Sequence, residues 1–482
     1  MSASIESRGI LLFVASYLRE FHSTKALDWE RYLTPFHNLF FAYCQRSVKV
    51  SQGLSEDHEF LVPYGNNDLI HSVENHQKYY RILKGEALAS RCVTRIADPC
   101  SIAIERFVFP YSRVSKIAMV TFPSLQKKLL YYLMSLGRVK KLRLDYLQRE
   151  SVVECSPMRL ELIDALAKSF GEVDRGMLER YALLLPSIYV ENFSFYYERA
   201  KDEAAKLADV RLIYMNRHFL YNPNFLLLLC LECLADKEFV TFQHGACYGQ
   251  TGPGWSERSE KELATRFLTW GYSYVAKDVP FVSLRFQKPL PWSRIREPSV
   301  KSQKKLIVLP LLFPDQDEQI RSSFDILSRI VGQRETVAVR FDPREKNQAI
   351  LAGFLDDAKI SWKEEDDPHG LTVVARLYKT VLFVTPNATG YLELLNLGVA
   401  PYMVFSESAF KLREESLDVY REMKSSLLWL DAGNCGDARF GPLDQGQKRA
   451  LKNFQRRFIR TSYVPSLRLM HFLFRLARKG SC

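Results

Sequence analysis

The alternation of short apolar runs with amphipathic segments between residues 304 and 430 restricts the fold of this chain more than any other feature. Apolar runs of strand length lie at 304–313, 335–341, 359–362, 380–385, 400–405 and 426–430. Helical patterns separate them near 316–331, 344–356, 370–379, 390–397 and 410–423. Strands and helices that alternate through short links are typical of a parallel, doubly wound sheet with helices on both faces.

The N-terminal half repeats this pattern less regularly, and a second α/β domain is expected in a chain of 482 residues. Strands are predicted at 116–122, 210–215, 238–244 and 266–270, and helices near 124–136, 157–185, 193–207 and 223–236. Residues 1–110 are mostly helical by pattern. The segment 287–305, with three prolines and many cations, is the predicted linker. We therefore predict two Rossmann-like domains, at 1–295 and 304–445, followed by a basic amphipathic helical tail at 448–482.

The composition argues against several classes of protein. No apolar run approaches the length of about 18 residues that a membrane-spanning helix needs. The N-terminal apolar stretch lacks the cleavage site of a signal peptide, which favours a cytoplasmic protein. Nine cysteines without regular spacing argue against a disulfide framework. Cys230 and Cys233 fall within an apolar helical pattern that core packing explains, and no metal is predicted.

Positive charge is concentrated at the C-terminus. Residues 448–482 contain ten Lys or Arg and no Asp or Glu, within a net charge of +12 for the whole chain. The cations are mixed with Phe and Leu, a combination that suits a helix lying on an anionic membrane. A closing helix that packs its apolar face on the body fits the same pattern. Because no nucleic-acid-binding motif accompanies the charge, no nucleic-acid partner is expected.

Ligands of doubly wound domains bind in the loops that follow the carboxyl ends of the strands. After the fourth strand of the C-terminal half, a Pro-Asn turn contains Asn387, and Thr389 or Gly390 caps the next helix. Free N–H groups at that helix start are suited to a phosphate. Glu393, in the first turn, is placed to accept hydrogen bonds from ribose hydroxyls, or it acts only as a capping residue.

Two further loops carry candidate residues. Arg340, at the end of the second C-terminal strand, offers a guanidinium fork for phosphate, or it ends the strand without a ligand. His244 follows a predicted strand in QHGACYG, where an imidazole can act as a general base or hydrogen-bond a leaving phosphate. Gly245 and Gly249 permit close backbone approach, and a glycine-rich turn with a structural histidine is the alternative. Asn216 follows a neighbouring strand in the equivalent position.

The segment QHGACYG, with Glu262 and RFLTWGY after it, resembles a family of surface-carbohydrate (O-antigen locus) transferases. That family carries Q-H-G-G-x-Y-G, then a Glu and an Asp, then L-T-W-G-W. The resemblance covers roughly residues 180–430 and includes LPSIYVENF, YMNRHFLYN, VAVRFDP and TGYLE. The chain departs from the family at four positions: Ala246 and Cys247 in the loop, Thr265 in place of the Asp, and Tyr272 in place of the second Trp.

The resemblance implies a GT-B-like glycosyltransferase, related to enzymes that use CMP-activated Kdo or nonulosonic acids and more distantly to CDP-glycerol glycerophosphotransferases. It implies that Gln243 and His244 face the cleft from the acceptor-side domain, in a loop that also holds Tyr248. Across the cleft, the nucleotide and its phosphate would be held by Arg340, Asn387, Thr389 and Glu393. With Thr265 replacing the family's Asp, the carboxylates left for a nucleophile or base are Glu191, Glu257 and Glu262, of which Glu191 and Glu262 are favoured.

The predicted function is transfer of a sugar from a nucleotide donor to a cell-surface glycan or a lipid-linked glycan. A CMP-linked 3-deoxy sugar, such as Kdo or a nonulosonic acid, is the donor favoured by the resemblance. No metal and no cofactor are expected beside the nucleotide-sugar co-substrate. Two alternatives stay open: a CDP-glycerol-type glycerophosphotransferase, and a catalytically silent binding homologue within a glycan-assembly complex.

Overall fold

The computed structural model describes most of the chain in segments. These are residues 2–50, 93–94, 102–105, 117–119, 139–144, 151–152, 157–173, 175–185, 189–190, 193–215, 223–252, 254–286, 302–309, 317–332, 335–342, 348–386 and 388–479. Three predicted site residues lie outside these segments: Glu191, Asn216 and Asn387. The predicted helix at 124–136 and most of the predicted linker, 287–301, also lie outside them.

The C-terminal half forms a six-stranded, fully parallel sheet. Its strands are β10 (Ser302–Val308), β11 (Val337–Arg340), β12 (Trp362–Glu364), β13 (Tyr378–Phe383), β14 (Tyr402–Val404) and β15 (Trp429–Leu430). They lie in the order β12-β11-β10-β13-β14-β15. This is the doubly wound order of Rossmann domains, in which the chain changes direction between the two central strands, β10 and β13. The predicted fold of this half is confirmed.

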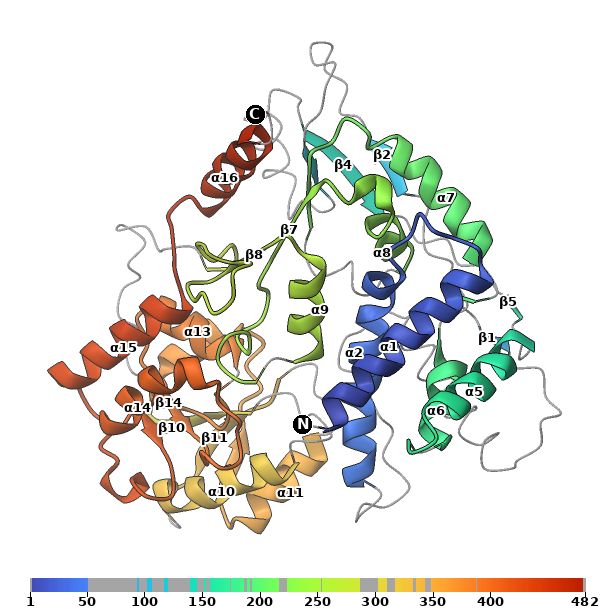
Figure 1. Ribbon diagram of the computed structural model, residues 1–482. Helices are drawn as coiled ribbons and strands as arrows, with labels where there is room; N and C mark the ends of the chain where they lie inside the picture. The colour runs from blue at the N-terminus through green and yellow to red at the C-terminus, as the bar shows by residue number, and fades with distance from the viewer. Residues whose placement is uncertain are drawn as a thin grey trace.

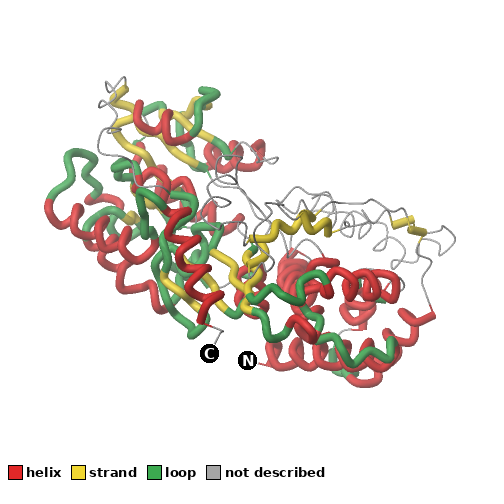
Figure 2. Tube along the Cα trace, turned by 90° about the horizontal axis from the view of Figure 1, so that it is seen from above, coloured by secondary structure: helices red, strands yellow, loops and turns green. Residues whose placement is uncertain are grey.

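Helices cover both faces of this sheet. They are α10 (Asp317–Val331), α11 (Gln348–Asp357), α12 (Leu371–Val374), α13 (Thr389–Asn396) and α14 (Leu417–Ser425), with short 3₁₀ turns at Ala375–Leu377, Glu414–Ser416 and Cys435–Asp437. The central strand β10 has Leu306 and Ile307 completely buried, as expected of a parallel strand covered on both faces. Figure 2 shows the helices packed around the strands.

The described residues of the N-terminal half form a seven-stranded sheet. Its strands are β2 (Ile102–Glu105), β3 (Ile117–Met119), β4 (Val139–Leu144), β6 (Leu212–Tyr214), β7 (Glu238–Phe242), β8 (Arg266–Thr269) and β9 (Asp278–Pro280), in the order β2-β4-β3-β6-β7-β8-β9. All neighbours are parallel except β2 and β4, which are antiparallel. A separate antiparallel pair joins β1 (Val93–Thr94) to β5 (Ser151–Val152). Two doubly wound domains, the GT-B-like architecture expected from the sequence, are therefore present.

A helical layer packs against one side of the N-terminal domain (Figure 1). It consists of α1 (Ser2–Phe21), α2 (Trp29–Val50), α5 (Pro157–Ser169), α6 (Arg175–Leu184), α7 (Phe193–Ala205) and α8 (Pro223–Leu229). The single helix predicted at 157–185 is two helices, because the chain turns at Gly171 between α5 and α6. The helix predicted at 223–236 ends at Leu229, and Leu231 then bridges Leu27. Cys230 is buried there, as predicted, whereas Cys233 is exposed.

The basic C-terminal segment is divided between the two domains. α15 (Gln445–Phe458) starts at a capping box between Asp444 and Gln447 and buries Phe454 and Phe458 in the C-terminal core. The chain then crosses to the N-terminal domain, where Arg460 N donates to Trp270 O at 2.6 Å. α16 (Pro465–Lys479) packs on the N-terminal sheet (Figure 1). Within the described segments, no helix is both long and apolar enough to span a membrane.

Candidate active site

The loop after β7 is held in place by Gln243, whose side chain is buried. Gln243 Oε1 accepts a hydrogen bond from Trp270 N at 2.9 Å, and Gln243 Nε2 donates to Gly245 O at 2.8 Å. Its backbone N–H donates to Leu268 O at 2.8 Å. Although the resemblance implied that Gln243 faces the cleft, its amide is directed at the backbone of β8 and of its own loop. In this conformation Gln243 positions the loop.

His244, the next residue, lies against a buried carboxylate. His244 Nδ1 is 3.2 Å from Glu260 Oε1, and the Glu260 side chain is fully buried on α9 (Trp255–Leu263). The contact is close but not aligned as a hydrogen bond: among the described residues, His244 Nδ1 and both Glu260 oxygens have no hydrogen-bond partner. On the other side of the ring, His244 Nε2 is 3.2 Å from the Tyr248 hydroxyl, which donates to Ser256 Oγ at 3.0 Å. The imidazole therefore lies between a buried carboxylate at Nδ1 and the Tyr248 hydroxyl at Nε2.

The structure does not bring Glu262, the predicted catalytic carboxylate, to His244. Glu262 lies on the other side of α9 from Glu260 and accepts a hydrogen bond from Asn38 Nδ2 of α2 at 3.2 Å. Two positions along a helix rotate a side chain by about 200°, because a turn takes 3.6 residues. Sequence reasoning missed Glu260. No sequence signal singles it out, because the buried face of α9 also carries Glu257 and Ser259.

Thr265 stands where the resembled family has Asp. It lies beside the start of β7, whereas His244 follows the end of that strand. Thr265 Oγ1 accepts a hydrogen bond from Phe239 N at 2.9 Å, at the start of β7. His244 follows the end of β7, and five strand residues span about 16 Å. The substitution at Thr265 therefore leaves the surroundings of His244 unchanged.

Across from the His244 loop lies the start of α13. Ala246 N donates to Thr389 Oγ1 at 3.4 Å, a contact between the two domains. Ala388 stands at the N-cap of α13 and has no side-chain acceptor for the first N–H groups of the helix. A Cβ added to Gly390 would lie 2.6 Å from Leu371 Cδ2, so a glycine fits where α12 and α13 pack closely. The start of α13, which was predicted to hold phosphate, therefore contacts the loop after β7 that carries His244, residues 243–254 (the histidine loop).

The two charged residues predicted on the nucleotide side are already paired. Arg285, near the end of the N-terminal domain, donates to Glu393 Oε1 from Nε at 2.9 Å and from Nη2 at 2.7 Å. Arg340 Nη1 donates to Asp367 O at 3.0 Å and Nη2 to His369 O at 2.6 Å. Glu393 thus joins the domains, whereas Arg340 supports the loop before α12.

Residues 61–323 match the family model described as LIC12162 family transferase, which is more than half of the chain. The matched region includes β7, the His244 loop and α9. The chain belongs to this family. The description of the family names its members as transferases. No curated protein matches this chain.

Several solved structures share the general fold of this LIC12162 family member. MurG of Acinetobacter baumannii is 9% identical, with a TM-score of 0.37, over 75% of this chain and 99% of MurG. MnaA of S. aureus, solved with UDP, is 10% identical, with a TM-score of 0.40, and the match covers 75% of this chain and 97% of MnaA. The O-GlcNAc transferase of Thermobaculum terrenum is 12% identical, with a TM-score of 0.38, and the match covers 98% of this chain and 89% of the transferase. At these TM-scores the likeness is loose, and the fold assignment rests on the strand order.

In this LIC12162 family member, the second half of the histidine loop is anchored to the C-terminal domain. Gln250 Oε1 accepts a hydrogen bond from the Tyr420 hydroxyl at 2.6 Å, and Gln250 O accepts one from Arg413 N at 2.9 Å. Gly249 has φ 76°, and a Cβ there would lie 2.4 Å from the Tyr272 ring. The loop therefore needs glycine at this position for two reasons, backbone conformation and space.

A chain of buried charges fixes α9. Lys261 Nζ is 3.0 Å from Glu257 Oε1 and 2.8 Å from Asp278 Oδ1. Arg413 of the C-terminal domain donates to Glu257 Oε2 at 2.9 Å. Because each charge has an opposite partner, α9 is held in one orientation, with Glu260 directed at His244.

Cys247 is not an alternative nucleophile in this loop. Burial, with the nearby negative charge of Glu257, raises the pKa of its thiol to about 12. The reactive form of cysteine is the thiolate, so the side chain is unreactive at neutral pH. Among the described residues, no group of three His, Cys, Asp or Glu side chains is arranged to hold a metal ion.

Proposed function

We propose that this transferase is a GT-B glycosyltransferase that moves a sugar from a nucleotide donor to a cell-surface or lipid-linked glycan. The observation that carries the proposal is the contact between the two halves of the site. His244, backed by the buried Glu260, lies in a loop that meets the start of α13 through Ala246 and Thr389. Chemistry on an acceptor and binding of a phosphate are thereby supported at one place.

In the proposed reaction His244 acts as the general base. The acceptor hydroxyl first displaces Tyr248 from Nε2, and the ring proton lies on Nδ1, facing Glu260. Nε2 then accepts the proton of the acceptor hydroxyl while that oxygen bonds to the anomeric carbon and the bond from this carbon to the donor phosphate breaks. Glu260 stabilises the imidazolium that forms, as a buried carboxylate does beside a catalytic histidine. Before the acceptor binds, Tyr248 and Ser256 hold the Nε2 side of the ring in place.

The start of α13 is the proposed site of the departing phosphate. Its uncapped N–H groups and the helix dipole favour negative charge, so they stabilise the phosphate as the bond breaks. Glu393 would accept hydrogen bonds from the ribose hydroxyls, and Asn387 and Arg340 complete the proposed nucleotide site. We propose that this set acts without a metal or a cofactor.

The donor we propose is a CMP-linked 3-deoxy sugar, such as Kdo or a nonulosonic acid. The motif resemblance supports this choice, and a donor panel tests it. CMP-Kdo and CDP-glycerol are each supplied with a glycan acceptor, and the mass added to the acceptor is measured. Addition of glycerophosphate instead of a sugar would contradict the proposal.

The central test is His244→Ala, compared with His471→Ala on the exposed face of α16. Transfer is expected to fall about 10²–10⁴-fold in the first variant, because a general base contributes that much. It is expected to be unchanged in the second. Undiminished transfer by His244→Ala would remove His244 from the mechanism.

We also propose that the C-terminal helices contact anionic lipid by charge alone. Their apolar faces are buried against the two domains, whereas Lys448, Lys452, Arg456 and Arg468 are exposed. Sedimentation with vesicles that contain phosphatidylglycerol should therefore decrease steeply between 50 and 500 mM salt, about the range over which screening becomes complete. Vesicle binding that salt leaves unchanged would contradict a purely electrostatic contact.

A further inference from the structure

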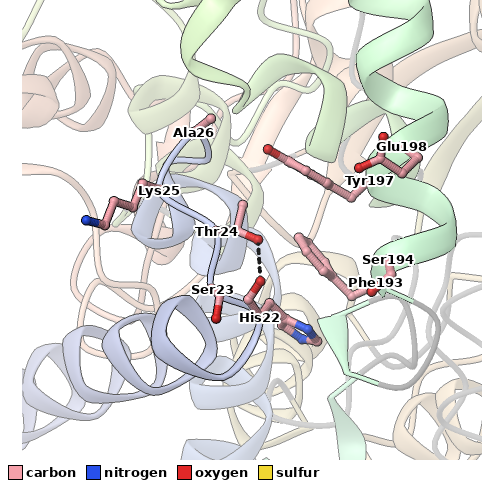
Figure 3. A pocket seen from close by; sticks show the side chains of 9 residues that line it. All are labelled: His22, Ser23, Thr24, Lys25, Ala26, Phe193, Ser194, Tyr197 and Glu198. Carbon is pink, nitrogen blue, oxygen red and sulfur yellow. Dashed lines mark hydrogen bonds between the residues drawn. The ribbon is translucent and has the colours of Figure 1, made fainter.

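A pocket of about 500 Å³ lies outside the proposed transfer site. Residues 22–26, which connect α1 to α2, form one wall, and the first turns of α7 form the other. Figure 3 shows Phe193 and Tyr197 extending from α7 towards this connecting loop, with the His22 ring below them. No role in the proposed transfer reaction uses this pocket.

Both walls of the pocket are fixed by contacts with the protein body. Ala26 O accepts a hydrogen bond from Glu232 N at 3.1 Å, and His22 Nε2 is 3.1 Å from Tyr189 O. The Phe193 ring packs on the Tyr197 ring with centroids 5.2 Å apart. A pocket with such walls exists before a ligand arrives, as most small-molecule sites do.

The chemistry of the lining is mixed. Tyr197 supplies partly exposed aromatic surface, backed by the buried Phe193 ring, and the rim carries the hydroxyls of Ser23 and Ser194. The lining carboxylate, Glu198, accepts hydrogen bonds from Lys201 Nζ at 2.9 and 3.1 Å, and Lys25 supplies an ammonium. The polar, charged rim does not suit a lipid tail.

We propose that this pocket binds one saccharide unit of the glycan acceptor, at a distance from the unit that receives the sugar. A pyranose ring has an apolar C–H face, which packs on aromatic rings, and hydroxyls, which bond to carboxylate and hydroxyl groups. Both features match this lining. The inference rests on the proposed function, because it assumes that the acceptor is a glycan.

The pocket belongs to the same packed unit as the catalytic histidine. α2, which begins just after the pocket loop, packs on α9 (Figure 1). Asn38 Nδ2 of α2 donates to Ser259 Oγ at 3.0 Å, and Ser259 precedes Glu260. A long acceptor held in the pocket would therefore be fixed relative to His244. The pocket should affect the KM for long acceptors and leave kcat unchanged.

The test measures binding directly, by saturation-transfer NMR with the methyl glycosides of glucose, galactose and N-acetylglucosamine. The variant is Tyr197→Ala, and the matched control is Phe195→Ala, which lies on the same helix, is half exposed and does not line the pocket. At least one glycoside is expected to bind, and Tyr197→Ala should weaken it about fivefold. Glu198→Gln, which keeps the side chain's shape, should weaken it by a smaller factor. Thermal melts check that each variant is folded.

The outcomes separate this inference from the proposed function. Glycoside binding that survives in His244→Ala, with transfer lost, would agree with both. Absence of binding by all three glycosides, or equal binding by wild type and Tyr197→Ala, would overturn the pocket assignment while leaving transfer to be measured independently. If the pocket is correct and transfer is absent, the protein binds glycans without the proposed chemistry.

Discussion

Glu260 and Glu262 are two positions apart on α9, yet only Glu260 contacts the histidine. We expect Glu260→Gln to lower kcat about 10²-fold or more, because the amide keeps the shape but loses the charge that stabilises the imidazolium. Glu262→Gln, an exposed change on the same helix, is the matched control and should leave kcat unchanged. Steady-state transfer kinetics distinguish the two, and equal kcat values for Glu260→Gln and wild type would show that the carboxylate only supports the fold.

His37 is a second buried histidine, with a role in stability. Its Nδ1 lies 3.2 Å from the Tyr181 hydroxyl on α6. Burial, with the charge of Arg8 adding to it, lowers the pKa of His37 from 6.5 to about 3. The unfolded chain therefore binds a proton between these pH values that the folded chain does not, so acid favours unfolding.

The stability that neutral His37 contributes should be complete above pH 6.5 and decrease towards pH 3. The expected slope from this group is at most about 1.4 kcal/mol of unfolding free energy per pH unit. Urea unfolding between pH 4.5 and 7.5 measures it, and His37→Gln should remove this part of the slope. A change of the same size in His471→Gln, at an exposed position, would contradict the assignment to His37.

Among the elements, the loop between β7 and α9 makes the strictest demand on a single residue. Gly249 and Gly332 share almost the same backbone angle, with φ of 76° and 75°. A Cβ on Gly332 meets nothing within 4 Å, whereas one on Gly249 lies 2.4 Å from the Tyr272 ring. The pair of glycines therefore separates the effect of conformation from the effect of crowding.

Gly332→Ala should cost on the order of 1 kcal/mol of unfolding free energy, for the left-handed backbone alone. Gly249→Ala should cost about 1–3 kcal/mol more, because the Tyr272 ring must move. It should also reduce transfer, since the displaced loop carries His244. Thermal or urea unfolding of both variants measures the difference, and equal losses would mean that the loop yields without strain.

Most regular elements of the C-terminal half could be predicted from the sequence because its central strands contain apolar runs and its links are short. The edge strand β12 is Trp-Lys-Glu and mostly exposed, so the strand predicted at 359–362 was placed too early. The orientation of α9 could not be predicted. Its buried face carries Glu257, Ser259 and Glu260, so polarity does not distinguish the buried side from the exposed one. The candidate loops were found from strand ends, but the choice of carboxylate depends on a rotation about α9 that only the packing reveals.

At the scale of the whole molecule, the two domains are joined by side chains far apart in sequence. Glu393 is 108 positions from Arg285, and no sequence pattern indicates that they form an ion pair. The crossing segment adds a second connection, since Ser283 N donates to Arg460 O at 2.6 Å. Gly271 permits this approach, because a Cβ there would lie 2.7 Å from Arg457 O. These polar contacts add to a hydrophobic cluster that includes residues of both domains, and together they set the relative position of the domains and of the site.

The ion pair between Arg285 and Glu393 leads to opposite predictions for its two partners. If Glu393 binds ribose as proposed, Arg285 competes with the nucleotide for the same carboxylate. Arg285→Gln should then strengthen CMP binding by about two- to fivefold, the value of a half-exposed ion pair, and Glu393→Gln should weaken it. Isothermal titration with CMP measures both. Weaker binding in both variants would mean that Arg285 itself contacts the nucleotide and that the pair is part of the site, not a contact that nucleotide binding must break.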